Sequence, residues 1–351
     1  MAEVKRTKRE YGGFLPLELN PGVEYFAKYE PYLGRFNSVK AGLDFLIRRM
    51  GKKRIYISYY YCPSTVEAIK QTGIEVCFYH INDKLMPENI IDDPDSIFLL
   101  VDYFGICSKK VNLLSESLTN TEVIVDRAHG FYEEPLINER IHNVYSAKKF
   151  FGIPDGAYIV SKAITPNLQA PIDAYGYAGY LILTYEEGTN AAYARKKEVD
   201  KEIEKNYNCM SKLAIGLLKN VNYERVRIQR EINYRYLFEE FKDINALTLP
   251  EKCAAYQFPL LIKDWGEQIK RKLVEDCIFV PTLWSGKDLA ESGNDFEKAM
   301  MNDCVFLPID QRYDKRDMEY IASKVKEILT DLEDERKYLT QRPEMKLRDG
   351  F

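Results

Sequence analysis

The chain has 351 residues, 46% of them hydrophobic and 30% charged, which is the composition of a globular protein large enough for two lobes. Fifty basic residues against 54 acidic ones give a net charge of −4, which argues against a general nucleic-acid binder. Seven scattered cysteines without a C-x-x-C pair, and a total of three histidines, argue against a disulfide framework, a structural zinc site and a multi-histidine metal centre.

The N-terminal segment and the longest apolar runs bear on the cellular compartment of the protein. Residues 1–13 are charged and lack the apolar run of a signal peptide. Apolar runs such as SIFLLVDYF are too short to span a bilayer. We therefore expect a soluble, cytoplasmic protein that has reduced thiols and no contact with a membrane.

The first half of the chain alternates predicted helices and strands. Helices are predicted over residues 38–50, 64–72, 87–92 and 110–119. The second of them is expected to be capped by Ser64 or Thr65 and followed by Gly73. Strands are predicted over residues 54–61, 75–81, 97–104, 123–126, 143–146 and 157–161. This alternation indicates a mostly parallel sheet covered on both faces, in which ligands bind beyond the carboxyl ends of the strands.

The second half changes character and predicts a smaller α+β lobe. It is charged and helical over residues 191–245, has candidate strands at 254–263, 277–280 and 304–308, and ends in a predicted helix over 315–334. The domain organisation that follows is an N-terminal arm (1–20), a large domain (21–205), a small C-terminal domain (206–335) and a polar tail (336–351). The polarity of this tail predicts partial disorder.

The segment VIVDRAHG places Asp126 at the end of an apolar strand, with His129 three residues later. A carboxylate there faces the expected ligand zone. It can pair with a cation, coordinate a metal, act as an acid or base, or merely cap a turn, and the segment alone leaves these alternatives open.

A second candidate segment, YSAKKFFGIPDGAYIV, follows another strand and contains Ser146-x-x-Lys149. A lysine held against aromatic and apolar neighbours loses solvation, so its amine is more easily neutral and nucleophilic. The hydroxyl group of Ser146 could bind a phosphate beside it. Because Lys148 is adjacent, a plain basic loop is the alternative interpretation.

In chain order, the segments GGF, RFNSVKAGL, ISYYYCPSTVEAI, VIVDRAHG and YSAKKFFGIPDGA resemble the DegT-type sugar aminotransferases, which are fold-type-I pyridoxal-phosphate enzymes of the aspartate-aminotransferase superfamily. The resemblance covers residues 12–161, becomes looser through KNYNCMSKLAIGLL and is faint in the C-terminal lobe. It implies an α/β protein with a three-layer, aspartate-aminotransferase-like large domain and a mostly parallel sheet, plus the smaller α+β lobe. It also implies a homodimer with sites near the subunit boundary.

The resemblance further implies that pyridoxal 5′-phosphate is the cofactor. Lys149 matches the lysine that forms a Schiff base with this cofactor and then moves the proton. Asp126 matches the carboxylate that pairs with the pyridine nitrogen and makes the ring an electron sink. His129 matches a position near the ring hydroxyl, and Ser146 resembles the phosphate-binding serine.

Other cofactor contacts are implied at three further places. Asn37, Ser38, Val39 and Lys40 match the phosphate loop at the start of a helix, where N–H groups form an anion site. Tyr61 matches the ring that stacks on the cofactor, with Tyr60 as the alternative. Asn208, or alternatively Asn206, matches the asparagine that reaches the other subunit's cofactor phosphate.

We expect a transaminase that takes an amino group from a donor such as glutamate and passes it to a keto group, on a nucleotide-linked sugar as acceptor. Two departures, Val39 where relatives often have glycine and Cys209 where they have arginine, keep open a catalytically retired relative that acts as a binding protein. Another cofactor-dependent reaction, such as a dehydratase or a condensation, is a further alternative. Lys149 weighs against the family's sugar dehydratases, in which a histidine replaces the lysine.

Several other residues are candidates for substrate contacts or for structural roles. Trp284 and Arg312 are possible substrate contacts, although an ion pair is the favoured role for Arg312. His80 and His142 are expected at the surface or as satisfied core residues, and nothing near Cys62 suggests an activated thiolate.

Overall fold

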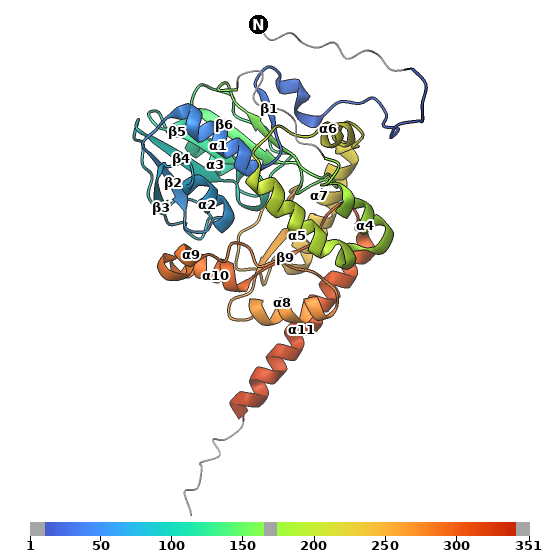
Figure 1. Cartoon of the computed structure of the whole chain (residues 1–351). Coiled ribbons are helices and arrows are strands. Elements are labelled where there is room, and N and C mark those ends of the chain that lie inside the picture. The colour runs from blue at the N-terminus through green and yellow to red at the C-terminus, as the bar shows by residue number, and fades with distance from the viewer. Residues whose placement is uncertain (1–10, 165–173, 342–351) are drawn as a thin grey trace, which may run out of the picture.

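The computed structural model describes residues 11–164 and 174–341. The larger lobe is built around a seven-stranded sheet, and the smaller one contains a two-stranded sheet (Figure 1). The large sheet has the order β1-β7-β6-β5-β4-β2-β3. Its strands are β1 (Leu33–Phe36), β2 (Arg54–Ser58), β3 (Glu75–Tyr79), β4 (Ser96–Val101), β5 (Glu122–Asp126), β6 (Ile141–Ser146) and β7 (Ala157–Val160). All neighbours pair in parallel except β7, which is antiparallel to both β1 and β6.

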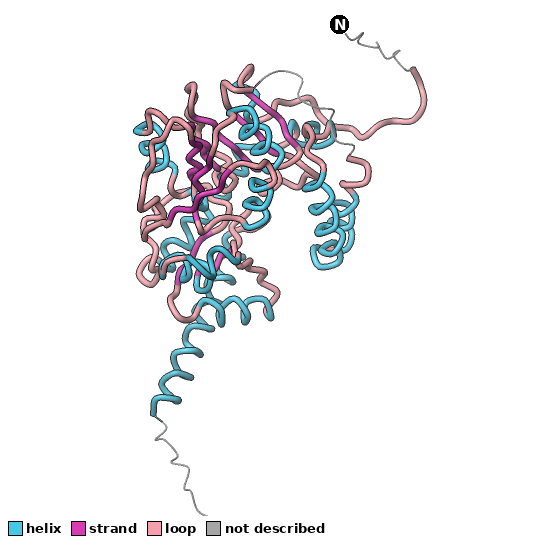
Figure 2. Tube along the Cα trace, turned by 60° about the vertical axis from the view of Figure 1, so that its left-hand side comes forward, coloured by secondary structure: helices cyan, strands magenta, loops and turns pink. Residues whose placement is uncertain are grey.

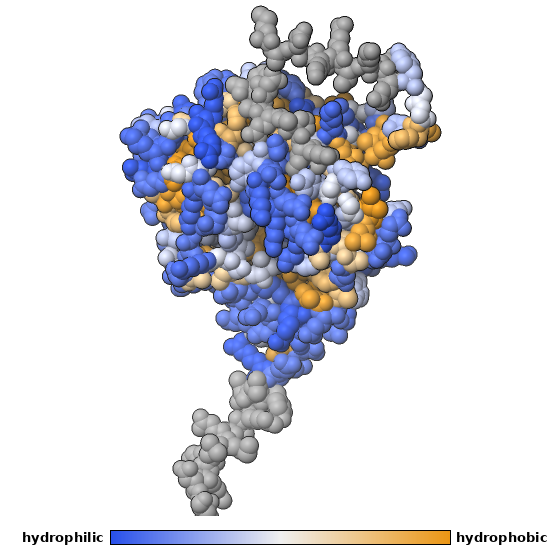
Figure 3. All heavy atoms as spheres, viewed as in Figure 1, coloured by the Kyte–Doolittle hydropathy of each residue, from blue (hydrophilic) through white to orange (hydrophobic). Residues whose placement is uncertain are grey.

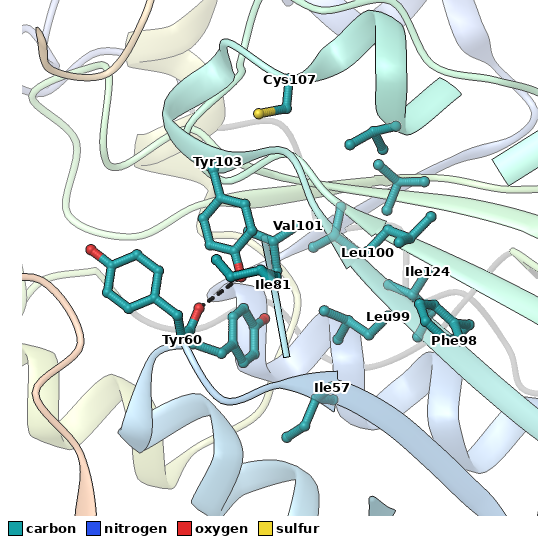
Figure 4. Close-up of a cluster of buried hydrophobic side chains, with 14 of the residues drawn as sticks. Ile57, Tyr60, Ile81, Phe98, Leu99, Leu100, Val101, Tyr103, Cys107 and Ile124 are labelled. Atoms are coloured by element: carbon teal, nitrogen blue, oxygen red, sulfur yellow. Dashed lines mark hydrogen bonds between the residues drawn. The ribbon is translucent and has the colours of Figure 1, made fainter. Parts of the chain in front are cut away.

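The central strands are buried on both faces. Every residue of β4 and β6 is buried, as expected for parallel strands between two layers of helices. Figure 4 shows part of this core, in which Tyr60 lies beside Tyr103 and accepts a 2.8 Å hydrogen bond from the Tyr103 hydroxyl at its backbone oxygen. The helices of this lobe are α1 (Val39–Met50), α2 (Pro63–Lys70) and α3 (Ser108–Ser117), with short 3-10 turns η1 (Tyr25–Tyr29) and η2 (Tyr103–Gly105).

The smaller lobe has its own hydrophobic core. Tyr234, Phe258, Leu307 and Val325 are fully buried members of this second cluster. It is formed by α7 (Tyr223–Phe241), β8 (Phe258–Leu261), α8 (Gly266–Glu275), β9 (Cys304–Leu307) and α11 (Lys315–Gln341). Helices α9 (Lys287–Ser292) and α10 (Asp295–Asp303) precede β9. Figure 2 shows the strands of the large sheet above and α11 projecting below.

Three helices of the described residues lie between the two lobes in the chain. They are α4 (Gly179–Glu187), α5 (Thr189–Lys205) and α6 (Lys212–Lys219). Met210 and Leu218, from the α6 region, pack in one cluster with Phe26 and Phe131 of the large lobe. The α6 region therefore packs with the large lobe, whereas the sequence predicts the domain boundary at residue 206, and that boundary stays a prediction.

The expected fold class is confirmed: the protein is α/β, with a mostly parallel central sheet and a smaller α+β lobe. The predicted helix at 87–92 is wrong. The side-chain oxygen of Asn82 accepts from the backbone N–H groups of Lys84 and Met86, which makes a turn, and Pro87 then forms an isolated bridge with Ile81.

Three other features differ from the prediction: a helix cap, a strand and a helix end. Helix α2 is capped at Cys62 rather than Ser64 or Thr65, because Pro63 fits the first helical position. The predicted strand at 277–280 is absent, because Cys277 turns at φ +60° and the N–H of Ile278 bonds back to α8. Helix α11 continues to Gln341, into the predicted tail, and the rest of that tail lies outside the described residues.

An extended N-terminal segment lies outside both cores. Phe14 is 95% exposed, and Leu15 and Leu17 are also exposed. Figure 3 shows hydrophobic side chains of this segment on the surface. No helix in the described part of the chain is both long and apolar enough to cross a membrane.

Candidate active site

A cavity of about 220 Å³ opens at the carboxyl ends of β4, β5 and β6, beside the starts of α1 and α2. The structure brings nine of the predicted residues into its wall: Asn37, Ser38, Val39, Lys40, Tyr61, Asp126, His129, Ser146 and Lys149. Asn208 is absent from this lining. The position of the cavity agrees with the general location of ligand sites in parallel sheets.

Lys149 lies in a tight loop directly after β6. The N–H of Ala147 donates to the carbonyl of Gly156 at 3.1 Å, and the buried rings of Phe150 and Phe151 anchor the turn. The Nζ atom of Lys149 lies 2.7 Å from Nε2 of His129. Burial lowers the pKa of the Lys149 amine, against the opposing effects of Cys62 and Asp126. The amine is therefore more readily neutral than that of an exposed lysine.

His129 is a buried, neutral partner of this amine. Burial and the charge of Lys149 hold the imidazole pKa well below its ordinary value. The ring stacks on Trp284 at 5.3 Å and on Tyr256 at 4.8 Å between centroids. Its Nδ1 atom is buried and has no hydrogen-bond partner among the described residues. A buried polar atom without a partner is costly, so this nitrogen is available to a polar group of a ligand.

Asp126 ends β5 and faces the same cavity. Its Oδ1 accepts from the N–H of Ala128 at 2.8 Å, and its Oδ2 accepts from the Tyr61 hydroxyl at 2.5 Å. Within the described ranges, no lysine, arginine or histidine nitrogen lies within 4 Å of this carboxylate. Because a buried anion is costly without a counter-charge, the arrangement suits a cationic or N–H-bearing ligand group.

Tyr61 makes two contacts in the cavity, a hydrogen bond from its hydroxyl group to Asp126 and a ring contact with Trp284. Burial and the neighbouring Asp126 raise the pKa of the phenol well above its ordinary value, so it donates to the carboxylate. The ring lies 6.2 Å from Trp284. Tyr60, the alternative for a stacking ring, is fully buried and lies outside the cavity wall.

The opposite end of the cavity contains a helix N-terminus. Ser38 caps α1, where its Oγ accepts from the N–H of Ala41 at 3.1 Å, and Ser146 ends β6. The first N–H groups of a helix have no intrahelical acceptor, and together with the helix dipole they favour an anion.

The side chain of Asn37 is hydrogen-bonded to the backbone of the segment that contains Asn206 and Asn208. The Asn37 side chain donates to the Asn206 carbonyl at 2.5 Å and accepts from the Asn208 N–H at 3.2 Å. Asn37 thus fixes this segment beside α1 with its side-chain oxygen and one of its two amide hydrogens.

Several residues in the cavity wall have no ligand contact predicted from the sequence, among them Cys62, Lys148, Asp200 and Glu204. Lys148 lies in the YSAKK segment, but its pairing with Asp200 joins distant parts of the chain, as does the pairing of Lys40 with Glu204, so no local motif indicates these contacts. For Cys62, burial raises the thiol pKa, but hydrogen bonds with Ser64 and Thr65 and the charge of Lys149 outweigh that effect and lower it. The position of Cys62 at the start of α2 could have indicated this lowered pKa, because a helix N-terminus favours a thiolate.

A buried ion pair supports the strand ends beneath the cavity. Arg127 is fully buried, and its NH1 atom lies 3.1 Å from Oδ2 of Asp102. Its Nε donates to the side chain of Asn143 at 3.3 Å. This network joins the ends of β4 and β5 to β6 and thereby fixes the position of Asp126.

A second cavity, of about 430 Å³, reaches Lys149 from the smaller lobe. Arg230, Arg312 and Tyr256 are among its lining residues. Arg312 binds Asp310 with two hydrogen bonds of 2.8 Å, which agrees with the favoured ion-pair role. Trp284 lines the first cavity instead.

The other two histidines have satisfied partners. His142 is buried between Ser161 and Glu122, and His80 binds Glu297 at 2.9 Å. Both therefore have structural roles, as expected.

No family model and no curated protein matches the sequence. Solved structures do match the fold. One is a sugar aminotransferase from Micromonospora echinospora, with 13% identity and a TM-score of 0.58 over 87% of this chain and 93% of that one. Another is a putative sugar aminotransferase from Streptococcus pneumoniae in its PMP form, with 13% identity and a TM-score of 0.60 over 86% and 90%.

A third match is GDP-4-keto-6-deoxy-D-mannose-3-dehydratase from E. coli with bound hydrated PLP. It shares 16% identity, with a TM-score of 0.59 over 86% of this chain and 89% of that one. The protein therefore has the fold of these enzymes. This likeness extends over both lobes.

Proposed function

We propose that the protein is a pyridoxal-phosphate-dependent aminotransferase. It takes an amino group from an amino acid such as glutamate and transfers it to a keto group of a nucleotide-linked sugar. The observation that carries the proposal is that one cavity contains both the buried, pKa-lowered amine of Lys149 and the carboxylate of Asp126, which has hydrogen-bond donors but no ion-pair partner among the described residues. The solved structures of the same fold with PMP or PLP support it.

The residues present fit the cofactor. Asp126 offers an anion for the ring nitrogen, the unpartnered Nδ1 of His129 offers a hydrogen-bonding group beside the ring, and the α1 N-terminus with Ser38 and Ser146 suits a phosphate. When bound, the cofactor supplies an aldehyde and an electron-withdrawing ring.

The remaining chemistry belongs to the chain's own residues. Lys149 is the nucleophile for the aldehyde and, once released, the base that moves the substrate proton. His129 is neutral and holds the lysine Nζ atom in place at 2.7 Å. Asp126 would keep a proton at the ring nitrogen, and the rings of Trp284 and Tyr61 line the cavity.

We further propose a cytoplasmic homodimer. The exposed Phe14, Leu15 and Leu17 of the N-terminal segment are an apolar surface that a second copy would cover. All seven cysteines are free thiols, which fits a reducing compartment. Ultracentrifugation should give the mass of a dimer, and a strictly monomeric active enzyme would contradict the proposal.

The test of function is the first half of transamination, which needs no knowledge of the acceptor. Glutamate added to the cofactor-loaded protein should abolish the long-wavelength absorption band and release 2-oxoglutarate. Glutamine, aspartate and alanine are the next donors, and nucleotide-linked keto-sugars are then offered to the loaded enzyme. If a donor converts the cofactor but no keto-sugar is turned over, the protein is still an aminotransferase and only the proposed acceptor class is wrong.

A second candidate function is a PLP-dependent dehydratase, because the matches of the same fold include two structures of such an enzyme. A protein that binds the cofactor but is converted by no donor would favour this candidate or another PLP reaction. A protein that binds no cofactor would instead be a catalytically retired relative.

A further inference from the structure

Helix α5 closes one side of the candidate active site with carboxylates. It runs from α4 to the start of α1 (Figure 1), and Asp200, Ile203 and Glu204 line the cavity. Asp200 binds Lys148 at 2.6 Å, and Glu204 binds Lys40 at 2.7 Å. Both cavity-lining ion pairs thus join α5 to the phosphate end of the site.

The two lysines belong to the part of the cavity that suits an anion. Lys40 lies in the first turn of α1, after the cap Ser38, and Lys148 follows Ser146 by two residues. The side chains of Lys148 and Lys40 are only 20% and 10% exposed, so each ammonium group needs a counter-charge nearby. In this structure, the counter-charges come from Asp200 and Glu204.

A phosphate monoester carries about −1.5 to −2 charges near neutral pH, the charge of these two carboxylates together. A phosphate that reaches both amines must therefore displace the carboxylates or lie against two like charges. Since like charges at hydrogen-bonding distance repel strongly in a partly buried site, displacement is favoured.

Most of helix α5 packs on α4, and its C-terminal cap Asn206 accepts a hydrogen bond from the side chain of Asn37. The buried residues Val199 and Ile203 form a small cluster with Tyr180 of α4, separate from the three larger cores. The hydroxyl of Tyr180 donates to the carbonyl of Ile153 at 2.9 Å. A helix pair packed mainly on itself opens at lower cost than an element of a main core.

We propose that Asp200 and Glu204 are built-in counter-ions that hold α5 over the cavity and compete with a bound phosphate for Lys148 and Lys40. Phosphate binding releases α5, and the two carboxylates set the affinity of the site for the phosphate. The inference rests on the proposed function for the identity of the ligand, a phosphate monoester.

Hydrogen exchange of residues 189–205 tests this release directly. In the full-length wild-type chain, inorganic phosphate and pyridoxal phosphate should each raise the exchange rate of α5. In the double variant Asp200→Asn/Glu204→Gln, exchange should be fast from the start and unchanged by phosphate. Affinity for phosphate should rise about tenfold, because two partly exposed ion pairs each contribute a few-fold.

Glu202→Gln is the matched control, because Glu202 is exposed on the same helix and lies outside the cavity wall. It should behave as wild type. The single variants Asp200→Asn and Glu204→Gln should each give part of the effect. Slower exchange of α5 with phosphate, weaker phosphate binding by the double variant, or no effect of either ligand on α5 would overturn the inference.

Pyridoxal, which lacks the phosphate, separates this inference from the proposed function. It should attach to Lys149 without raising α5 exchange. If inorganic phosphate releases α5 but neither aldehyde attaches to Lys149, the proposed function fails and the inference stands. If pyridoxal phosphate attaches to Lys149 and α5 exchange is unchanged, the inference fails and the proposed function stands.

Discussion

The two ends of the candidate active site are constructed differently. At the ring end, Asp126 and Lys149 sit on or directly after central strands and are fixed by buried hydrogen bonds and the Arg127–Asp102 pair. At the phosphate end, half-exposed carboxylates of α5 hold the lysines across the cavity. A rigid, low-dielectric end is suited to chemistry, whereas an end closed by ion pairs is suited to exchange of a ligand.

The largest effect is expected at the ring end, from Lys149→Ala. Loss of the nucleophile and base should slow the donor half-reaction by about 10²- to 10⁴-fold, the usual contribution of a positioned acid–base group. Borohydride treatment followed by mass spectrometry should find a cofactor adduct on Lys149 in the wild type and none in the variant. Lys148→Gln is the adjacent control and should keep the adduct, so an adduct on Lys148 would refute the assignment.

Asp126→Ala should give the next largest effect. The carboxylate would no longer hold the proton at the ring nitrogen, and loss of such a charged hydrogen bond costs about 1.5–3 kcal/mol. Turnover should fall about 10- to 100-fold, while circular dichroism and thermal unfolding show a folded protein. Wild-type turnover would mean that Asp126 merely caps the turn through Ala128.

The pH dependence of adduct formation should reveal the environment of Lys149. Burial lowers the pKa of this amine below its usual 10.5, so the neutral, reactive form should predominate at a lower pH than in an exposed lysine. The rate of adduct formation should rise with pH and level off below that usual value. A midpoint at or above the value for an exposed lysine would contradict a desolvated amine.

Tyr61→Phe distinguishes the two contacts of this side chain. The ring stays and the hydrogen bond to Oδ2 of Asp126 is lost, at a net cost of about 0.5–1.5 kcal/mol. Turnover should fall about two- to tenfold, while cofactor retention is little changed. A large loss of retention with full turnover would instead assign Tyr61 a binding role.

The ring end could be predicted from the sequence because its residues follow strands within short, local motifs. VIVDRAHG and YSAKK each combine an apolar strand with a reactive group directly beyond it. The α5 contacts could not be found this way. Lys148 and Asp200 are 52 residues apart, and nothing in a charged amphipathic helix indicates which carboxylate will face a cavity.

The same distinction explains the errors in secondary structure. The absent strand at 277–280 has suitable β-branched residues, but a strand needs a partner, and Ile278 bonds back to the helix that precedes it. At 87–92, the chain does not form the predicted helix because the side chain of Asn82 makes a local turn just before it. Helix propensity alone does not reveal this turn.

The smallest effect concerns the phosphate end, where Ser38→Ala is compared with Ser211→Ala. Each serine caps a helix by accepting an N–H at 3.1 Å from the residue three positions later, so each substitution should cost about 1 kcal/mol of stability. Only Ser38 lines the cavity, and only its loss should weaken the binding of pyridoxal phosphate, by about two- to tenfold. Thermal unfolding measures the loss of stability, and titration of the cofactor-free protein with pyridoxal phosphate measures the loss of affinity.

If both variants lose the same stability but only the Ser38 variant loses affinity, Ser38 binds the anion as well as capping its helix, whereas Ser211 only caps its helix. Equal affinities would show that the phosphate is bound without the Ser38 hydroxyl, which would leave the lysines and the backbone N–H groups of α1 to hold it.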